Sequence, residues 1–517
     1  MINGTKNLYN EYERLLLKNT DLSEEIRSLK YSNRLLESKN QTLAESEKKA
    51  KERIQEQEDE LNKKDREIER LKALLGIDGT NSGIPTSQTP INKKKVIPNT
   101  REKSGLKKGG QKGHPKHKLE RFEDEEINAH VEHEMDSCPC CNSNSIKETG
   151  VVVEKDETDY KIIVEKRRHS FYEYECSQCG KKFHESIPNN LKEENQYGPQ
   201  VQALELTLMN QGNVAINKAQ KITYGLTGGE IDLSEGYIAK LQKRAANNLE
   251  EFMKELKAEI IKQPLLHWDD TVIMINTARG CLRFYGTEKL ALYAAHLHKD
   301  KNGLDKDNIL KLLPEETVVV HDHNKVNYND EYEYRNAECN RHLLGDLKKV
   351  TDNLKHGWAK ELAELLTKTN KKRNELIEKG IEEFTEEYLK EFNIKFDTIM
   401  LDAYTENEKD NNRYFSKGER TLILRILDYK ESYLLWVYDF DTPFTNNLSE
   451  RGLRSVKSKQ KASGQFWSEE SARWYAIIKS YIETCYRNGT NVYNALIMLS
   501  LGTPYTLKDI LSQDFDM

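Results

Sequence analysis

Leucine recurs every seven residues at the start of this chain, and this repeat restricts the first part of the chain to a long helix. Such heptads are typical of a coiled coil, in which leucine at d favours a parallel dimer. Asparagines at a positions lower the stability but select two strands and one register. We expect residues 1–78 to form a coiled-coil dimerisation helix; one helix packed on its own protein is the alternative. The repeat is Leu8, Leu15, Leu22, Leu29, Leu36 and Leu43, with Asn19, Asn33 and Asn40 at a.

The next segment, residues 79–119, is rich in Ser, Thr, Pro and Lys and has too few apolar residues to bury a core. We expect a basic flexible linker. The chain as a whole has a net charge of −6, so its average composition does not indicate nucleic-acid binding, but a local basic stripe is enough for phosphate contact. Lys107, Lys108 and Lys112 lie beside glycines and are candidate DNA-binding residues; a solvated basic tether is the other interpretation.

Four cysteines form two Cys-x-x-Cys pairs, Cys138 with Cys141 and Cys176 with Cys179. Two such pairs are the ligand pattern of a zinc ribbon, in which four thiolates hold one structural Zn²⁺. Cys140 is an alternative ligand with a less suitable spacing. We expect a zinc ribbon over residues 120–189, with short flanking strands such as residues 160–164.

The cysteine content and the absence of long apolar stretches indicate the cellular compartment. The eight cysteines are too few and too clustered for a disulfide framework, and no stretch resembles a signal peptide or a membrane span. We expect a soluble protein of the bacterial-type cytoplasm, associated with the nucleoid and not with a membrane.

Residues 190–262 show a helical apolar pattern interrupted by a Gly-rich turn. Ser234 is a candidate N-cap for the helix that follows this turn. We expect a helical DNA-binding segment like a helix-turn-helix, although ordinary helical hairpins are more common.

Residues 265–275 form an apolar, β-rich run with Asp269 near its middle. An acid inside an apolar strand is unfavourable unless it is paired or binds an ion, so Asp269 is a functional candidate. Its neighbour Asp270 should point to the opposite face of the strand. Two further apolar runs follow, and residues 317–321 predict a buried strand that ends at Asp322. This order of strands and acids is the ribonuclease-H-like arrangement.

A third acid, Glu450, lies at the start of a helical segment. A surface glutamate in a first helical turn is the ordinary interpretation there. Together with Asp269 and Asp322, however, it completes the kind of acidic set that holds two divalent cations.

Three motifs show a resemblance to a known family. His267-Trp268-Asp269-Asp270-Thr271, the segment His321 to Tyr328 and the segment Asn446 to Arg454 resemble the acid-bearing motifs of DDE-type transposases of the insertion-sequence-sixty-six family. The leucine repeat, the Gly-Gly-Gln-x-Gly-His linker and the cysteine pairs are also similar to that family. The sequence departs from it at Asp270, His321 and Lys116, none of which is a proposed ligand.

The resemblance implies a multidomain α+β protein with a ribonuclease-H-like α/β catalytic domain at residues 263–475. Glu450 follows Asp322 too distantly for a bare domain of this kind, so we expect a helical insertion at about residues 339–429. A C-terminal helical tail should follow at residues 476–517. Cys339-x-x-His342 begins the insertion; it could orient the insertion or touch DNA, but a buried Cys and His in a helix is the favoured interpretation.

The resemblance further implies catalysis by Asp269, Asp322 and Glu450 with two Mg²⁺ or Mn²⁺ ions per active site. Arg451, Arg454 and Lys457 are expected to bind DNA phosphates. The expected partners are transposon ends, target DNA and a second copy of the chain in a homodimer or larger assembly. A need for accessory proteins is left open.

Two other functions fit the same sequence. One is a non-catalytic zinc-ribbon DNA-binding regulator, in which the three acids are dispensable. The other is a ribonuclease-H-like nuclease that cuts DNA without strand transfer.

Overall fold

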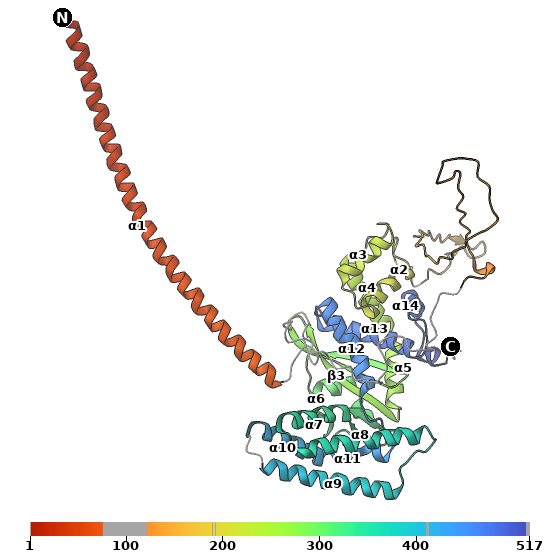
Figure 1. The fold of residues 1–517 in the computed structure, drawn as a ribbon. Helices are drawn as coiled ribbons and strands as arrows, with labels where there is room; N and C mark the ends of the chain where they lie inside the picture. The colour runs from red at the N-terminus through yellow and green to blue at the C-terminus, as the bar shows by residue number, and fades with distance from the viewer. Residues whose placement is uncertain (1, 76–120, 189, 192, 410–412, 513–517) are drawn as a thin grey trace. The chain divides into compact units, whose positions relative to one another are not determined.

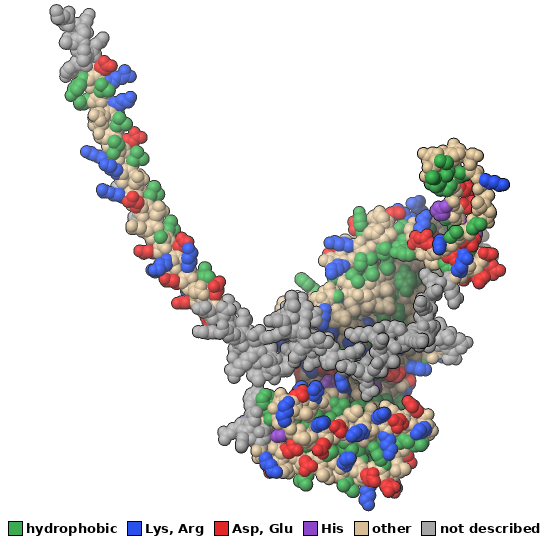
Figure 2. Space-filling view, viewed as in Figure 1, with side chains coloured by type: hydrophobic (Ala, Val, Ile, Leu, Met, Phe, Trp, Pro, Cys, Tyr) green, Lys and Arg blue, Asp and Glu red, His purple; other side chains and the backbone are tan. Residues whose placement is uncertain are grey.

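A computed structural model describes residues 2–75, 121–188, 190–191, 193–409 and 413–512, and it divides the chain into two units, Met1–Ser104 and Gly105–Met517. In the first unit, α1 (Ile2–Leu75) is one continuous helix, so the predicted helix is confirmed (Figure 1). The heptad leucines from Leu15 to Leu43 are 49–66% exposed, and Figure 2 shows apolar side chains open along the helix. The coiled-coil dimer itself stays a prediction. The predicted linker with Lys107, Lys108 and Lys112 lies outside the described residues.

The second unit begins with the cysteine-rich segment. A short 3₁₀ turn, η3 (Asp124–Glu126), precedes it, and β1 (Tyr174–Glu175) pairs antiparallel with β2 (Lys182–Phe183) to form a small hairpin around the second cysteine pair. The predicted strand at residues 160–164 is wrong, because this segment has no regular structure. Its Tyr160 and Ile163 are more than 70% exposed, and without a partner strand their backbone forms no ladder.

The predicted helical segment is present. Ser234 caps α4, since its Oγ accepts a hydrogen bond from Tyr237 N at 3.1 Å, and this prediction is confirmed. The helices pack with the C-terminal helices in one apolar core. The elements are α2 (Pro199–Leu206), the π-helical turn η4 (Thr207–Gln211), α3 (Ile216–Leu226), α4 (Glu235–Asn248) and α5 (Glu250–Ile261).

A five-stranded mixed sheet follows, in the order β5-β4-β3-β6-β7. The first three strands in sequence are antiparallel neighbours, whereas β6 and β7 run parallel to β3. The predicted strands around Asp269 and before Asp322 are therefore confirmed as elements. The strands are β3 (Leu265–Ile275), β4 (Ala278–Gly286), β5 (Ala291–His296), β6 (Val318–His321) and β7 (Arg335–Glu338).

Both faces of the sheet are covered. Phe284 on β4 packs in one core with apolar residues of α12 and α13, whereas the next residue, Tyr285, packs in another core with α5 and the segment after β5. This alternation is the period-two pattern of a strand between two layers. The remaining elements are α6 (Lys301–Asp307), η5 (Leu310–Leu312), η6 (Lys325–Asn327), α12 (Asn447–Ser463), α13 (Glu469–Arg487), α14 (Val492–Leu501) and α15 (Leu507–Leu511).

Between β7 and α12 lies a helical insertion with its own core around Trp358, Phe396 and Trp436 (Figure 1). Its helices continue to Tyr438, beyond the expected end near residue 429. Among the described residues, no helix has the length and apolar character needed to cross a membrane. In the described residues, the helices of the insertion are α7 (Asn340–Leu354), α8 (Gly357–Ile377), α9 (Glu386–Lys409), α10 (Arg413–Asp428) and α11 (Lys430–Tyr438).

Candidate active site

The strand register brings Asp269 and Asp322 together. The last pair between the parallel strands β3 and β6 is His267 with Val320. Each acid comes two residues after its member of that pair, so the two carboxylates lie opposite each other on the same side of the sheet. Adjacent strands are about 4.8 Å apart, so the two acids are close neighbours.

The electrostatics of Asp269 agree with this geometry. Burial, then the negative charge of Asp322 and then that of Asp270 raise its pKa from 3.8 to about 8. The nearby Lys457 ammonium acts in the opposite direction. An apolar site that gathers anions without enough cations is the environment that a bound divalent ion relieves.

Asp270 points to the other face of β3, as predicted. Its Oδ1 lies 2.5 Å from Lys299 Nζ, and its side chain is largely buried. Its charge is therefore balanced locally, whereas the charge of Asp269 is not.

Asn446 connects β3 to the helix that bears Glu450. It is fully buried, and its Nδ2 donates to Trp268 O at 2.9 Å. His267 Nδ1 lies 2.9 Å from Asn446 Oδ1. Burial lowers the pKa of His267, so the neutral ring donates from Nδ1 to this oxygen. Asn446 thus holds the start of α12 against the residues directly before Asp269.

Glu450 lies in the first turn of α12, four residues after Asn446, and therefore on the same side of the helix. Lys457 follows Glu450 by seven residues, two turns along that side, and its charge acts on Asp269. Glu450 is half-buried, whereas Arg451, Arg454 and Lys457 are exposed. The charge of Lys457 therefore reaches Asp269, and the helical spacing puts Glu450 on the same side of α12 as Lys457.

Asp322 also contacts the Cys-x-x-His element. His342 Nδ1 lies 3.0 Å from Asp322 Oδ1, and ligand atoms of Asp322, Cys339 and His342 all lie within 4.8 Å of one another. Contact with the Asp322 carboxylate, and then with the Cys339 thiol, raises the pKa of His342. The favoured interpretation of two buried residues holds for Cys339 but is wrong for His342, whose side chain is 52% exposed.

Within the described part of the chain, this trio is the one cluster of three or more such ligands at that distance. The carboxylate oxygens of Asp269, Asp322 and Glu450 therefore do not all lie within 4.8 Å of one another. The four cysteines do not form such a cluster either.

The two cysteine pairs are nevertheless shaped alike. Hydrogen bonds from the amides of Cys140 and Cys141 lower the pKa of Cys138, and those from Cys179 and Gln178 lower the pKa of Cys176. Amides that point at a thiolate favour metal binding. The shared backbone bonds are Asn142 N to Cys138 O and Cys138 N to Ser143 O in one turn, and Gly180 N to Cys176 O and Cys176 N to Lys181 O in the other.

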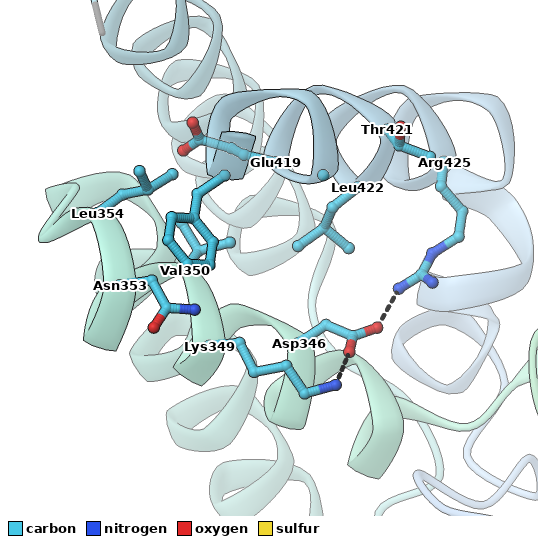
Figure 3. A pocket seen from close by; sticks show the side chains of 11 residues that line it. Asp346, Lys349, Val350, Asn353, Leu354, Glu419, Thr421, Leu422 and Arg425 are labelled. Atoms are coloured by element: carbon cyan, nitrogen blue, oxygen red, sulfur yellow. Dashed lines mark hydrogen bonds and ion pairs between the residues drawn. The ribbon is translucent and has the colours of Figure 1, made fainter. Parts of the chain in front are cut away.

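A cavity of about 270 Å³ lies elsewhere, between α7 and α10 of the insertion (Figure 3). Asp346 there forms ion pairs with Lys349 and Arg425, at 2.9 and 2.8 Å. None of the three predicted catalytic acids lines this cavity, so it is separate from the candidate active site.

The comparison with protein families finds a match over the part of the chain that contains the sheet. The family model described as "Transposase IS66 family" matches residues 194–474, which is more than half of the chain and includes all three acids. No curated protein matches the chain.

We expect the metal-free protein to lose stability as the pH rises from about 4 to about 8. Asp269 has an ordinary pKa of 3.8 and a folded pKa of about 8. Its contribution to the free energy of unfolding is therefore fully present below pH 3.8 and lost as the pH rises through 8. Thermal unfolding in EDTA should show a weaker pH dependence for Asp269→Asn than for the wild type. Identical pH profiles would contradict the assigned environment of Asp269.

We expect the purified protein to contain one Zn²⁺ per chain, bound by the two cysteine pairs. Cys176→Ser should lose the zinc, because a structural site needs all four ligands. Cys140→Ser is the matched control and should keep it. Elemental mass spectrometry measures the ratio of zinc to protein. Zinc that remains in Cys176→Ser, or that disappears in Cys140→Ser, would show that the ligand set is different.

Proposed function

This chain belongs to the IS66 transposase family, and we propose that it cleaves transposon ends and joins them to target DNA, with Asp269, Asp322 and Glu450 as the catalytic carboxylates. The observation that carries the proposal is the register of β3 and β6, which places two acids side by side, one of them with a strongly raised pKa. The strand order and directions also support a ribonuclease-H-like catalytic domain.

The residues present fit two divalent cations. Carboxylate oxygens suit Mg²⁺ or Mn²⁺. Asp322 Oδ1 is buried and faces His342 Nδ1 at 3.0 Å, so the remaining lone pairs of this carboxylate are the ones that would meet an ion. Asp269, Asp322 and Glu450 would hold the ions. When bound, the ions supply activation of a water or a DNA 3′-hydroxyl and stabilisation of the leaving oxygen.

Other residues of the site have roles that follow from their positions. Asn446 fixes α12 against β3 and so positions Glu450. Lys457 is exposed and its charge acts on Asp269, so its ammonium would bind the phosphate next to the scissile bond. Arg451 and Arg454, exposed on the same helix, would hold neighbouring phosphates.

The other parts of the chain support a DNA-bound assembly. The exposed leucines of α1 fit a coiled-coil homodimer, which would bring two active sites to a pair of DNA ends. The cysteine turns fit a zinc ribbon, and the helices before β3 carry exposed lysines suited to DNA contact. A cytoplasmic location at the nucleoid follows from a DNA substrate and stays a prediction.

We expect Asp269→Asn to reduce Mg²⁺-dependent cleavage of DNA that carries the element's ends by at least about a thousand-fold. The reason is that asparagine keeps the shape of the side chain but loses the charge that holds the cations. DNA binding should remain, and a gel assay with labelled end DNA measures both. Asp270→Asn, on the opposite face of the same strand, is the matched control and should still cleave.

The same assay separates the rival functions. A non-catalytic regulator would show no cleavage in the wild type, or equal cleavage in Asp269→Asn. A nuclease without strand transfer would cleave but would join no pre-cleaved end to target DNA. The proposal requires joined products from the wild type and none from Asp269→Asn.

A further inference from the structure

Trp467 is the most exposed large apolar side chain in the described residues, at 86%. In contrast, three other tryptophans, Trp268, Trp358 and Trp436, are at most 3% exposed. An indole buries a large apolar area when it finds a partner, so an exposed tryptophan on a fixed backbone is well suited to binding one.

The backbone of Trp467 is fixed on both sides. Directly before it, Phe466 donates its N–H to Met274 O and accepts at its carbonyl from Asn276 N, both at 2.9 Å. Directly after it, Ser468 caps α13, since its Oγ accepts from Ser471 N at 3.1 Å. Phe466 points into the core, so the next side chain points outward. The exposure of Trp467 is thus imposed by the fold and does not come from a loose loop.

A basic helix leads from the carboxylates to Trp467. α12 runs along β3: its start contacts Trp268, and near its end the Gln460 side-chain amide lies beside Val272 O and Met274 N, where one amide orientation would bond to both. The exposed cations along this path have no ion-pair partner within the described residues. They are Arg454, Lys457 and Lys461 on α12, and Arg279 at the start of β4.

The distance between Asp269 and Trp467 determines which nucleotide the indole can reach. From Asp269 to Ile275, beside Phe466, β3 rises by about 20 Å. One DNA strand advances 3.4 Å per nucleotide, so this span corresponds to about six nucleotides. Phosphates that follow α12 would therefore bring a base to Trp467 about six nucleotides from the scissile bond.

We propose that Trp467 stacks on an unpaired base of the DNA strand that follows α12. An indole face binds the face of any base, but bases inside a duplex are covered by their neighbours, so the partner must be single-stranded or frayed. This inference rests on the proposed function, because it takes the DNA path from the carboxylates. It adds that the bound DNA is locally unpaired at a fixed distance from the cleavage point.

The test measures DNA binding by the full-length protein in EDTA, where no chemistry occurs, with fluorescein-labelled oligothymidine of about 20 nucleotides and its duplex with oligoadenine. Trp467→Ala should weaken binding of the single strand by about ten-fold and leave duplex binding unchanged. Trp467→Phe retains an aromatic face and should restore most of the affinity. Tyr486→Ala removes another exposed ring, on α13, and is the control that should bind like the wild type.

A second readout does not depend on the alanine variant folding. Oligothymidine should quench tryptophan emission in the wild type and much less in Trp467→Phe. Unchanged single-strand affinity in Trp467→Ala, or equal losses for single strand and duplex, would overturn the proposal. The proposal would also be overturned if Trp467→Ala changed the oligomeric mass measured by light scattering while DNA binding stayed intact. Trp467 would then be a contact between copies of the chain. Cleavage by Asp269→Asn would refute the proposed function but would leave this binding result unaffected.

Discussion

One buried residue, Asn446, joins three segments around the candidate site. Its amide bonds to His267 and Trp268 on β3, and its backbone N–H donates to Cys339 Sγ at 3.2 Å. It therefore joins the strand that bears Asp269, the start of the insertion and the helix that bears Glu450. Because Asn446 is fully buried, loss of any one bond leaves a polar atom without water, which makes the junction rigid. A metal site assembled from distant segments needs such rigidity.

Much of this arrangement could be predicted from the sequence, because the spacing of apolar and polar residues determines strands and helices locally. The strand around Asp269 and the strand before Asp322 could be predicted from their apolar sequences alone, and both strands are present. Asp270 is expected on the face of β3 opposite to Asp269, because side chains alternate along a strand, and its ion pair with Lys299 agrees with this expectation. Ser234 as an N-cap and the helical heptads of α1 are equally local.

Features that depend on tertiary contacts could not be predicted in this way. β7 reads Arg-Asn-Ala-Glu, which has no strand pattern, and it is a strand because β6 offers it a parallel edge. The expected strand at residues 160–164 has a strand composition but no partner. The position of His342 beside Asp322 depends on where α7 begins, which the Cys-x-x-His spacing alone does not determine. Neither does any local pattern show that Trp467 remains exposed.

The central claim is that Asp269 and Asp322 share a pair of cations. Anomalous diffraction from crystals soaked in Mn²⁺ tests it most directly, because it locates each ion independently of activity. The account predicts two peaks, held by Asp269, Asp322 and Glu450. A single peak held by Asp322, Cys339 and His342, with none beside Asp269, would contradict it.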